Sequence, residues 1–199
     1  KGTAKMKYYV VADVHGFCSI LKDSLKGEGF FNDEEPHKLI VCGDLFDRGG
    51  EAVELQNFIL ELLEKDEVIL IKGNHEELLV DMLNSWHRAS YLESHHNSNG
   101  TVDTVLQLTG TRLADLYDNP SDVYYKMKET PFMQKILPAM VDYFETENHI
   151  FVHGWIPCES IRQNPYAVTY FAIDEWRNAS AKQWSSARWI NGMDAAHDG

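Results

Sequence analysis

The sequence predicts an α/β fold built on a βαβαβ core. Three short apolar runs rich in β-branched residues alternate with two segments whose apolar residues recur at helical spacing. This alternation implies parallel strands, right-handed crossovers and helices that cover the sheet. A length of 199 residues with an apolar fraction of 44% suits one globular domain with a sizeable core.

The first half of the chain contains the clearest elements. Strands are predicted at residues 7–13, 39–44 and 68–73, where the sequence reads KYYVVAD, LIVCGD and VILIKG. Helices are predicted between them at residues 17–26 and 51–63, because each segment places leucine, isoleucine or phenylalanine on one face. These five elements form the predicted core.

The pattern weakens after the third strand. A helix is predicted at residues 76–87, and residues 132–144 also have a helical pattern despite a proline. A short strand, HIFVH, is predicted at residues 149–153 and is expected to join the central sheet. Residues 88–130 are polar and mixed, and we interpret them as a helical cap or insertion. The pattern of residues 155–199 does not place elements firmly.

The composition disfavours several classes of partner. Lysine and arginine number 18 against 31 aspartates and glutamates, and the net charge of −13 repels nucleic acid and anionic lipid at long range. No apolar run approaches the roughly 18 residues that span a bilayer. Cys18, Cys42 and Cys158 are odd in number and far apart, which suits a reducing cytoplasm better than a disulfide framework. We therefore expect a cytoplasmic protein that binds neither nucleic acid nor membrane; its oligomeric state is not predicted.

Each predicted strand runs into polar residues that could bind metal. The segments are DVHG from Asp13, GDLFDRG from Gly43, GNHE from Gly73, and His153 with its following glycine. The carboxyl ends of parallel strands lie along one edge of a sheet, so we expect these segments to converge on one cleft. Carboxylate, imidazole and amide oxygen together suit a divalent cation such as Mn, Fe or Zn.

Asp44 has two carboxylate oxygens and could bridge two ions. Two ions about 3.5–4 Å apart can activate a shared water and hold a phosphoryl group for in-line attack. Asp13 and His15 reach one ion only if the strand is already breaking into a turn, which Gly16 permits. The pattern therefore indicates a hydrolytic site.

The blocks DxHG, GDxxDRG and GNHE, in this order and each after a strand, resemble the signature blocks of the calcineurin-like metallophosphoesterases. The resemblance is to the phosphoprotein phosphatase branch, which includes bacterial and phage serine/threonine phosphatases and symmetrical diadenosine tetraphosphatases. It covers residues 7–76 and about 149–154, and the spacing of the blocks agrees. It implies a metallophosphoesterase-type β-sandwich flanked by helices.

The resemblance also implies a ligand set for two divalent or trivalent metal ions, with Mn expected to serve in vitro and Fe or Zn as further candidates. The first ion would be held by Asp13 and His15, the second by Asn74 and His153, with Asp44 as the bridge.

A catalytic set is implied in the same way. His75 would be the general acid that protonates the leaving oxygen, and Asp47 would orient its ring and favour its charged form. Arg48 would clamp the phosphate oxygens with its planar guanidinium. A second phosphate-binding arginine is expected later in the chain, with Arg188 as the candidate and Arg177 as the reserve.

Simpler interpretations exist for each feature alone. Glycine, asparagine and aspartate are ordinary turn residues, although turns do not demand histidine and arginine in these slots. An arginine beside a tryptophan, as at Arg188, is commonly a cation–π or surface contact. His87, His95 and His96 lack a ligand spacing, and we interpret their segment as a solvated loop or cap.

One expected block is missing from the sequence. Members of the resembled branch carry a further strand and a Gly-His-x-His-type block that supplies the last ligand of the second metal. Here His197 is the only histidine after His153, and it lies in no such motif. We therefore expect residues 1–199 to be a single catalytic domain that is C-terminally truncated and lacks its last strand.

Three functions fit these features. The leading hypothesis is phosphomonoester hydrolysis, with a phosphorylated protein carrying phosphoserine or phosphothreonine as the substrate, or else a small phosphoester. The second is dinucleoside polyphosphate hydrolysis by the same centre, because the motifs fix the reaction at phosphorus and not the leaving group. The third is a non-catalytic phosphate-binding module that has lost a metal ligand.

Overall fold

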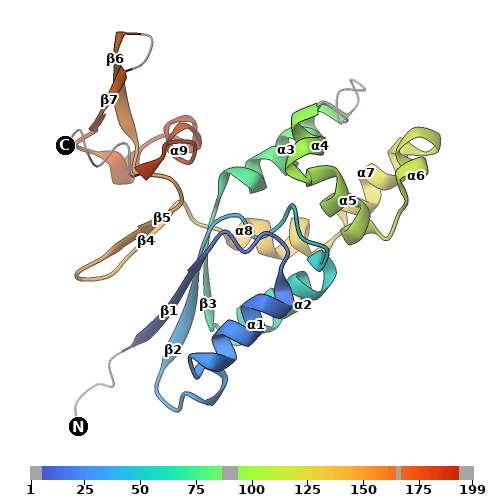
Figure 1. The fold of residues 1–199 in the computed structure, drawn as a ribbon, viewed down its shortest axis with the longest axis horizontal. Coiled ribbons are helices and arrows are strands. Elements are labelled where there is room, and N and C mark those ends of the chain that lie inside the picture. The colour runs from blue at the N-terminus through green and yellow to red at the C-terminus, as the bar shows by residue number, and fades with distance from the viewer. Residues whose placement is uncertain (1–5, 87–93, 165–166, 193–199) are drawn as a thin grey trace.

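The computed structural model describes residues 6–86, 94–164 and 167–192. A parallel sheet in the order β1, β2, β3 forms its centre, from Lys7–Ala12, His37–Cys42 and Val68–Ile71. The crossovers carry α1 (Cys18–Gly27), a short 3₁₀ turn, η1 (Phe30–Asn32), and α2 (Ala52–Glu64). Both long helices lie on the same side of the sheet (Figure 1). The predicted α/β core is confirmed.

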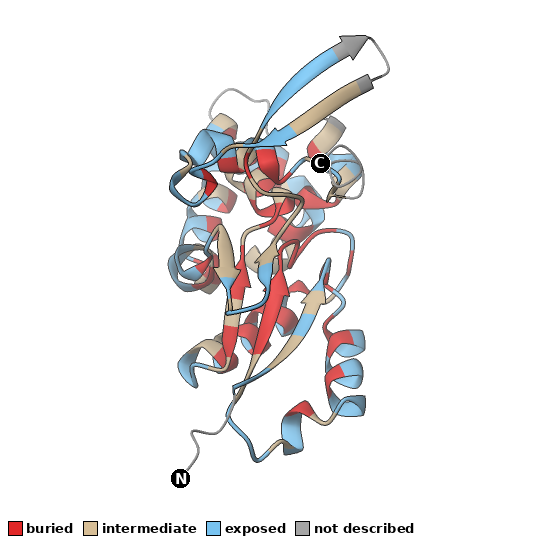
Figure 2. Cartoon of the chain, turned by 90° about the vertical axis from the view of Figure 1, so that its left-hand side faces the viewer, coloured by how far each residue is buried: buried red, intermediate tan, exposed pale blue. Residues whose placement is uncertain are grey.

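The middle strand, β2, is buried on both faces, as Figure 2 shows. Leu39 and Val41 pack into the main core with the apolar residues of α1 and α2. Ile40 and Cys42 belong to a smaller cluster on the opposite face. A strand covered on both sides needs no polar alternation, which explains why this part of the sequence is a continuous apolar run.

Between β3 and residue 128, all the secondary-structure elements that the structure describes are helices. The elements are α3 (Asn74–Ser85), α4 (Ser94–Asn99), α5 (Thr101–Thr109), α6 (Leu113–Asp118) and α7 (Pro120–Lys128). Val105 of α5 and Val123 of α7 belong to the same apolar cluster as Leu55 of α2. These helices therefore share the main core. The cap role of residues 88–130 and the single domain over residues 1–199 stay predictions.

Residues 132–144 do not form the helix that their pattern predicts. A π-helix, η3 (Phe132–Ile136), and one turn of α-helix, α8 (Leu137–Ala139), are followed by a strand, β4 (Tyr143–Glu145). Between α8 and β4, Val141 forms a parallel bridge with Ile71 at the edge of the central sheet. The prediction is wrong for the last residues because their backbone gains sheet hydrogen bonds at this edge.

The strand β5 (Ile150–Val152) pairs antiparallel with β4 and not with the central sheet. The prediction that residues 149–153 join the central sheet is therefore wrong, because a short turn allows local hairpin pairing with β4. Phe144 and Phe151 of this hairpin pack against the β2 and β3 face that α1 and α2 leave open. The hairpin thus forms the second layer of a sandwich.

The last described elements extend from this second layer. They are the hairpin strands β6 (Cys158–Asn164) and β7 (Ala167–Ala172), a 3₁₀ turn, η4 (Trp176–Asn178), and α9 (Ala181–Ala187). The β6–β7 hairpin projects from the body in Figure 1. Trp184 and Trp176 pack with Tyr143 of β4, which ties α9 to the second sheet.

Two further observations bear on the sequence analysis. All three cysteines are free thiols. Among the residues that the structure describes, no helix combines the length and the apolar character needed to cross a bilayer.

The packing of α2 leads to a prediction about stability. Leu55 is fully buried in the main core, whereas Val53 on the same helix is 39% exposed. Leu55→Ala should lower the free energy of unfolding by about 2–5 kcal/mol, because it removes buried atoms and leaves a cavity. Urea denaturation measures this loss, with Val53→Ala as the control. Equal small losses in both variants would contradict the described core.

Candidate active site

The three parallel strands end at the same level. Ala12, Cys42 and Ile71 are aligned partners in the sheet, so the loops that follow them leave the same edge side by side. Asp13, Asp44 and Asn74 therefore start from adjacent positions. The second layer adds His153, whose Nδ1 lies 3.0 Å from the carbonyl oxygen of Cys42. The structure brings the four predicted segments together.

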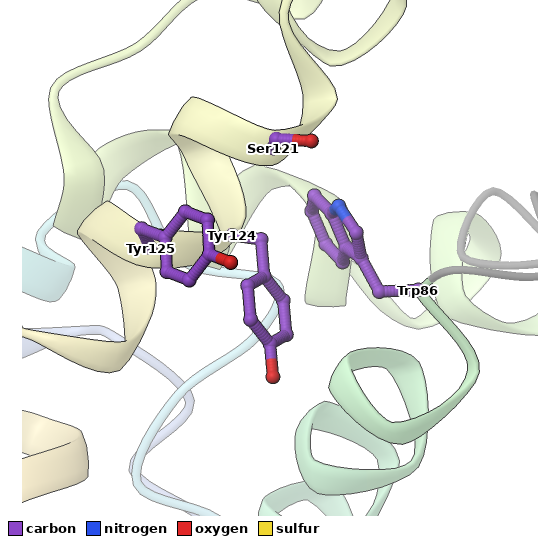
Figure 3. A pocket seen from close by; sticks show the side chains of 4 residues that line it. All are labelled: Trp86, Ser121, Tyr124 and Tyr125. Carbon is purple, nitrogen blue, oxygen red and sulfur yellow. The ribbon is translucent and has the colours of Figure 1, made fainter.

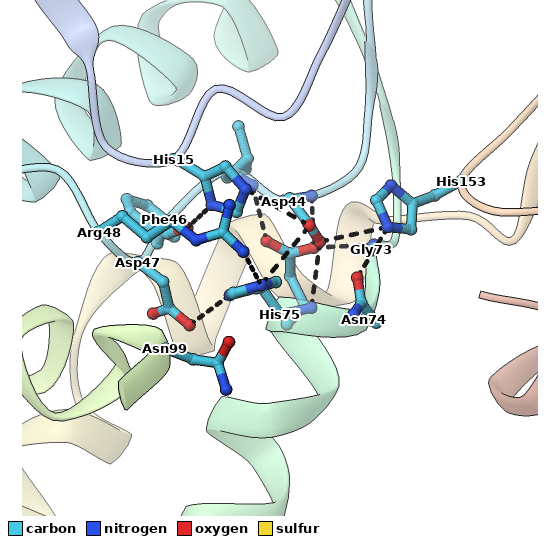
Figure 4. A network of polar contacts seen from close by, with 12 residues as sticks. His15, Asp44, Phe46, Asp47, Arg48, Gly73, Asn74, His75, Asn99 and His153 are labelled. Carbon is cyan, nitrogen blue, oxygen red and sulfur yellow. Dashed lines mark hydrogen bonds and ion pairs between the residues drawn. The ribbon is translucent and has the colours of Figure 1, made fainter. Parts of the chain in front are cut away.

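Asp44 stands at the centre of this convergence (Figure 4). The residue is only 4% exposed. Oδ2 lies 3.7 Å from Nε2 of His15 and 3.9 Å from Nε2 of His75, and Oδ1 lies 3.5 Å from Nε2 of His153. One carboxylate is thus faced by three imidazole rings, two from loops and one from the first turn of α3.

Hydrogen bonds at the other ring nitrogen fix the tautomer of two of these rings, those of His15 and His153. A carbonyl oxygen can only accept a hydrogen bond. Nδ1 of His15 is therefore the donor to the carbonyl oxygen of Phe46, at 3.0 Å, and Nδ1 of His153 is the donor to that of Cys42. In the neutral rings this leaves both Nε2 atoms as acceptors that point toward Asp44. Burial lowers the pKa of His15, which favours the neutral ring. A donated second nitrogen is typical of metal-binding histidines.

Asn74 adds a third acceptor to the same space. Its side-chain oxygen lies 2.8 Å from Nε2 of His153, and about 3.1 and 3.2 Å from the two oxygens of Asp44. Hydrogen-bond acceptors repel one another at these distances. The contact is favourable only if the Asn74 amide is rotated so that its NH₂ group faces these atoms, or if a cation lies between them. A cation with oxygen and imidazole ligands satisfies the arrangement without rotating Asn74.

Two groups of possible metal ligands share Asp44. One consists of His15, Asp44 and His75, and the other of Asp13, Asp44 and His153, with the ligand atoms of each group within 4.8 Å of one another. The shared carboxylate suits a bridging position. Asp13 lies with His153 here and not with His15, so the predicted division of ligands between two ions stays a prediction. The donor set fits divalent metal ions.

His75, a member of the first of these groups, also makes two side-chain hydrogen bonds. Its Nδ1 is 2.8 Å from Oδ2 of Asp47, and Nη2 of Arg48 donates to its Nε2 at 3.2 Å. Burial alone would lower the pKa of His75, but the hydrogen bond to Asp47 and the charges of Asp44 and Asp47 outweigh it and raise the pKa. The raised pKa favours a protonated ring, which requires Nη2 of Arg48 to move away from Nε2.

The backbone of these loops is strained. Asp13, His15, Asp44, Asp47 and Arg48 all have positive φ, between 49° and 73°, in the left-handed region that glycine favours. Hydrogen bonds between the loops hold this conformation, including His15 N–H to the Asp44 carbonyl at 2.9 Å and Gly49 N–H to the His15 carbonyl at 2.8 Å. Strain of this kind typically occurs at functional sites.

Glu76 is a structural part of the site to which the sequence analysis gave no role. Its carboxylate is 2% exposed and accepts backbone N–H groups of Gly73, Asp44 and Leu45 at 2.8, 3.1 and 2.9 Å. Burial and the charge of Asp44 raise its pKa to about 7, against these three donors. Its bond to the N–H of Gly73, the N-cap of α3, is the glutamate half of a capping box, but glycine has no side chain to supply the other half, so the sequence carries only part of the usual signal.

Arg188 is not an exposed or cation–π contact. It is 5% exposed, pairs with Glu77 and Asp142, and donates from Nε to the carbonyl oxygen of Lys72 at 3.1 Å. Phosphate binding would require it to release a carboxylate, so its phosphate role stays a prediction. The reserve, Arg177, forms a bidentate pair with Glu145 instead.

The histidines at residues 95 and 96 were expected in a solvated loop or cap. The solvated-loop interpretation is wrong for His96, which is fully buried with Nε2 3.5 Å from Oδ2 of Asp81, because α4 packs against α3 and α5. The cap interpretation stays a prediction. Asp81, His95 and His96 form a further group of possible ligands. His87 and His197 lie outside the described residues.

A separate cavity of about 250 Å³ lies in the helical part and is lined by Trp86, Ser121, Tyr124 and Tyr125 (Figure 3). Trp86 follows the last residue of α3, and His75 is near the first. Eleven residues of α-helix separate them by roughly 16 Å along the axis. The cavity is therefore distinct from the cluster around Asp44.

Comparison with known proteins gives the family. The sequence model of the calcineurin-like phosphoesterases matches residues 6–184. Serine/threonine-protein phosphatase 1 of Salmonella typhimurium is 34% identical over 73 residues, which are 37% of this chain and 31% of that protein. The symmetrical bis(5'-nucleosyl)-tetraphosphatase of Buchnera aphidicola subsp. Schizaphis graminum is 33% identical over 75 residues, 38% of this chain and 26% of that protein.

The matched stretch spans about a third or less of each of these curated relatives. A solved structure of a cold-active protein tyrosine phosphatase aligns with 77% of this chain and 44% of its own, at 20% identity and a TM-score of 0.48.

The packing around Asp44 leads to a prediction about metal binding. A Cβ atom on Gly73 would lie 2.1 Å from Oδ1 of Asp44, whereas one on Gly50 would meet nothing within 4 Å. Gly73→Ala should displace the carboxylate and weaken Mn²⁺ binding by about 10- to 100-fold, the usual effect of disturbing groups that orient ligands. Titration calorimetry measures the affinity, with Gly50→Ala as the control. Unchanged affinity in Gly73→Ala would show that Asp44 does not hold the ion.

Proposed function

The chain belongs to the calcineurin-like phosphoesterase family, and on this premise we propose that it is a metal-dependent phosphomonoesterase. The observation that carries the proposal is the hydrogen-bonded pair of His75 and Asp47 beside the ligand cluster of Asp44. A metal store or a structural metal site needs no such pair. A proton donor placed next to a cluster of metal ligands, with an arginine hydrogen-bonded to it, supports hydrolysis.

We assign the metal ligands to the strand-end residues. Asp13, His15, Asp44, Asn74 and His153 would hold the ions, and Asp44 would serve both. When bound, such ions supply Lewis-acid activation of a water and neutralise charge on the phosphoryl group. Mn is the first choice for reconstitution, and Fe and Zn also suit these ligands.

Arg48 has the charge and the position to bind the phosphoryl oxygens. Its Nη2 now donates to the neutral Nε2 of His75. A phosphate offers stronger, charge-assisted hydrogen bonds than a neutral imidazole does. Substrate binding would therefore draw the guanidinium to the phosphate and leave Nε2 of His75 able to carry a proton.

His75 then acts as the general acid. Asp47 holds the Nδ1 proton and so aims Nε2 away from itself and toward Asp44. As water adds to phosphorus, the bond to the leaving oxygen breaks and Nε2 of His75 gives its proton to that oxygen. The products are inorganic phosphate and the alcohol.

The preferred substrate is phosphoserine or phosphothreonine in a protein. One relative is named a serine/threonine-protein phosphatase and another a symmetrical bis(5'-nucleosyl)-tetraphosphatase, which favours dinucleoside polyphosphates as the second candidate. Both match this chain about equally, and the residues assigned above act only at phosphorus. The leaving group must therefore be identified by assay.

The first test is metal removal combined with a substrate panel. Chelated protein should be inactive on p-nitrophenyl phosphate and on a phosphoserine peptide, and Mn²⁺ should restore both activities, because no side chain pair here forms a nucleophile independent of metal. Rates are measured by release of nitrophenol and of phosphate.

Each alternative result has a distinct meaning. Turnover that survives exhaustive chelation would exclude the metal mechanism. Faster cleavage of diadenosine tetraphosphate than of the peptide would favour the second candidate. Mn²⁺ binding without turnover of any substrate would identify a non-catalytic phosphate-binding module.

The second test concerns the acid. His75→Asn should lower kcat by about 10²–10⁴, the usual contribution of a positioned acid, while leaving the Mn content unchanged. The loss should be smaller for p-nitrophenyl phosphate than for an alkyl phosphate, because nitrophenol leaves without protonation. Asp44→Asn is the contrasting variant and should lose Mn. Equal losses on both esters would refute the acid role of His75, and loss of Mn in His75→Asn would make it a ligand.

A further inference from the structure

The helix α5 holds the loop after β2 through one row of side chains. Thr101, Thr104 and Gln107 are spaced by three residues and so lie on one face of the helix. All three bond to the segment from Asp47 to Ala52. Gln107 donates to the carbonyl oxygen of Gly49 at 3.1 Å and accepts the N–H of Ala52 at 2.9 Å.

The two threonines bind the carboxylate of Asp47 from both ends. The Thr101 hydroxyl donates to Oδ2 and the Thr104 hydroxyl donates to Oδ1, each at 2.8 Å. The Thr104 oxygen also accepts the N–H of Asp47 at 3.0 Å. Oδ2 is the oxygen that accepts from Nδ1 of His75. The orientation of the carboxylate toward His75 is therefore set by two hydroxyl groups of α5.

These contacts are sealed from water. Thr101 is 0% exposed, Thr104 1% and Asp47 2%. A buried carboxylate has few partners other than protein donors, so each hydroxyl matters more than at the surface. Losing a hydrogen bond to a buried charged group also costs more than losing one between neutral groups.

The backbone at the start of α5 also lies close to the loop after β2. Gly100, directly before the helix, has φ of +85°, and a Cβ atom there would lie 2.4 Å from the backbone nitrogen of Arg48. Asp47 and Arg48 themselves have positive φ. A strained turn persists only where its surroundings over-determine it, and α5 supplies these restraints.

Threonines in a helix commonly bond back to their own helix, and α5 contains such a case. The hydroxyl of Thr109 contacts the carbonyl oxygen of Val105 at 2.6 Å. Thr101 and Thr104 instead turn to a residue more than 50 positions earlier in the chain. This contrast argues for a specific role and provides a control on the same helix.

We propose that Thr101 and Thr104 are positioning residues that fix the Asp47 carboxylate against His75, so that α5 aligns the proton donor. The structural part stands on the contacts described above, and the catalytic consequence rests on the proposed function. Neither threonine touches substrate. They act through Asp47 on the direction of the His75 ring.

The test replaces each hydroxyl with a methyl group of the same shape. Thr101→Val removes only the bond to Oδ2, and Thr104→Val also removes the acceptor of the Asp47 N–H. Thr104→Ser keeps the hydroxyl and should rescue, and Thr109→Val is the control. Circular dichroism first identifies the variants that fold. If Thr104→Val does not fold, Thr101→Val alone tests the proposal.

The first readout is made on metal-free protein. The Nδ1–H proton and the ring nitrogens of His75 are observed by NMR in wild type and variants. Thr101→Val and Thr104→Val should shift the Nδ1–H resonance, while Thr104→Ser and Thr109→Val should leave it near the wild-type position. An unchanged resonance in both valine variants would overturn the proposal. This readout does not depend on hydrolysis, so it separates failure of the proposal from failure of the proposed function.

The second readout is made on the Mn²⁺-loaded enzyme. Each valine variant should lower kcat on an alkyl phosphate by about 10- to 100-fold, the loss expected for one hydrogen bond to a buried charged group. KM and Mn content should stay near wild type, and the loss on p-nitrophenyl phosphate should be smaller. A rise in KM or a loss of Mn with kcat unchanged would assign the threonines a merely structural role and overturn the proposal.

Discussion

The site depends on how the buried carboxylate of Asp44 is compensated. A carboxylate removed from water is stable only when it is paired or hydrogen-bonded. The backbone N–H of His75 donates to it at 3.1 Å, and α3 begins there, so the positive end of the helix dipole faces the charge. The neighbouring Glu76 adds a second buried carboxylate, while His15 and His153 present acceptors. Positive charge is scarce at this point, which is why the cluster suits a metal cation.

The residues at the carboxyl ends of the parallel strands could be predicted from the sequence, because their convergence follows from the strand pattern alone. Strands in parallel register end at one level, so residues directly after the strands must meet, and Asp13, Asp44 and Asn74 do. The hairpin partner of β5 could not be predicted, since pairing with β4 depends on the turn between them and on Val141 bridging to the sheet edge. Glu76 carries only the glutamate half of a capping pattern, because the N-cap of α3 is Gly73.

Other supports of the site come from far along the chain and leave no motif. A threonine in a helix has no pattern that points to Asp47, so only the packed structure brings α5 to that loop. The loop of His153 is held in a comparable way, because the N–H of Trp155 donates to the carbonyl oxygen of Ala187 at 3.1 Å. Arg188, the next residue, joins α3 to the start of β4 through Glu77 and Asp142.

These supports explain how the strained loops can exist. Each non-glycine residue with positive φ costs on the order of 1–3 kcal/mol if its surroundings do not enforce it. The loops bearing Asp13, His15 and Asp44 brace one another through backbone hydrogen bonds, and the bond from Gly49 N–H to the His15 carbonyl extends this to the turn of Asp47 and Arg48. A further restraint on that turn comes from α5, whose own position is set by Val105 in the main core. The orientation of the His75 ring is therefore coupled through Asp47 to the packing of the helical layer, although within the described residues no side chain of the apolar core forms a hydrogen bond with His75.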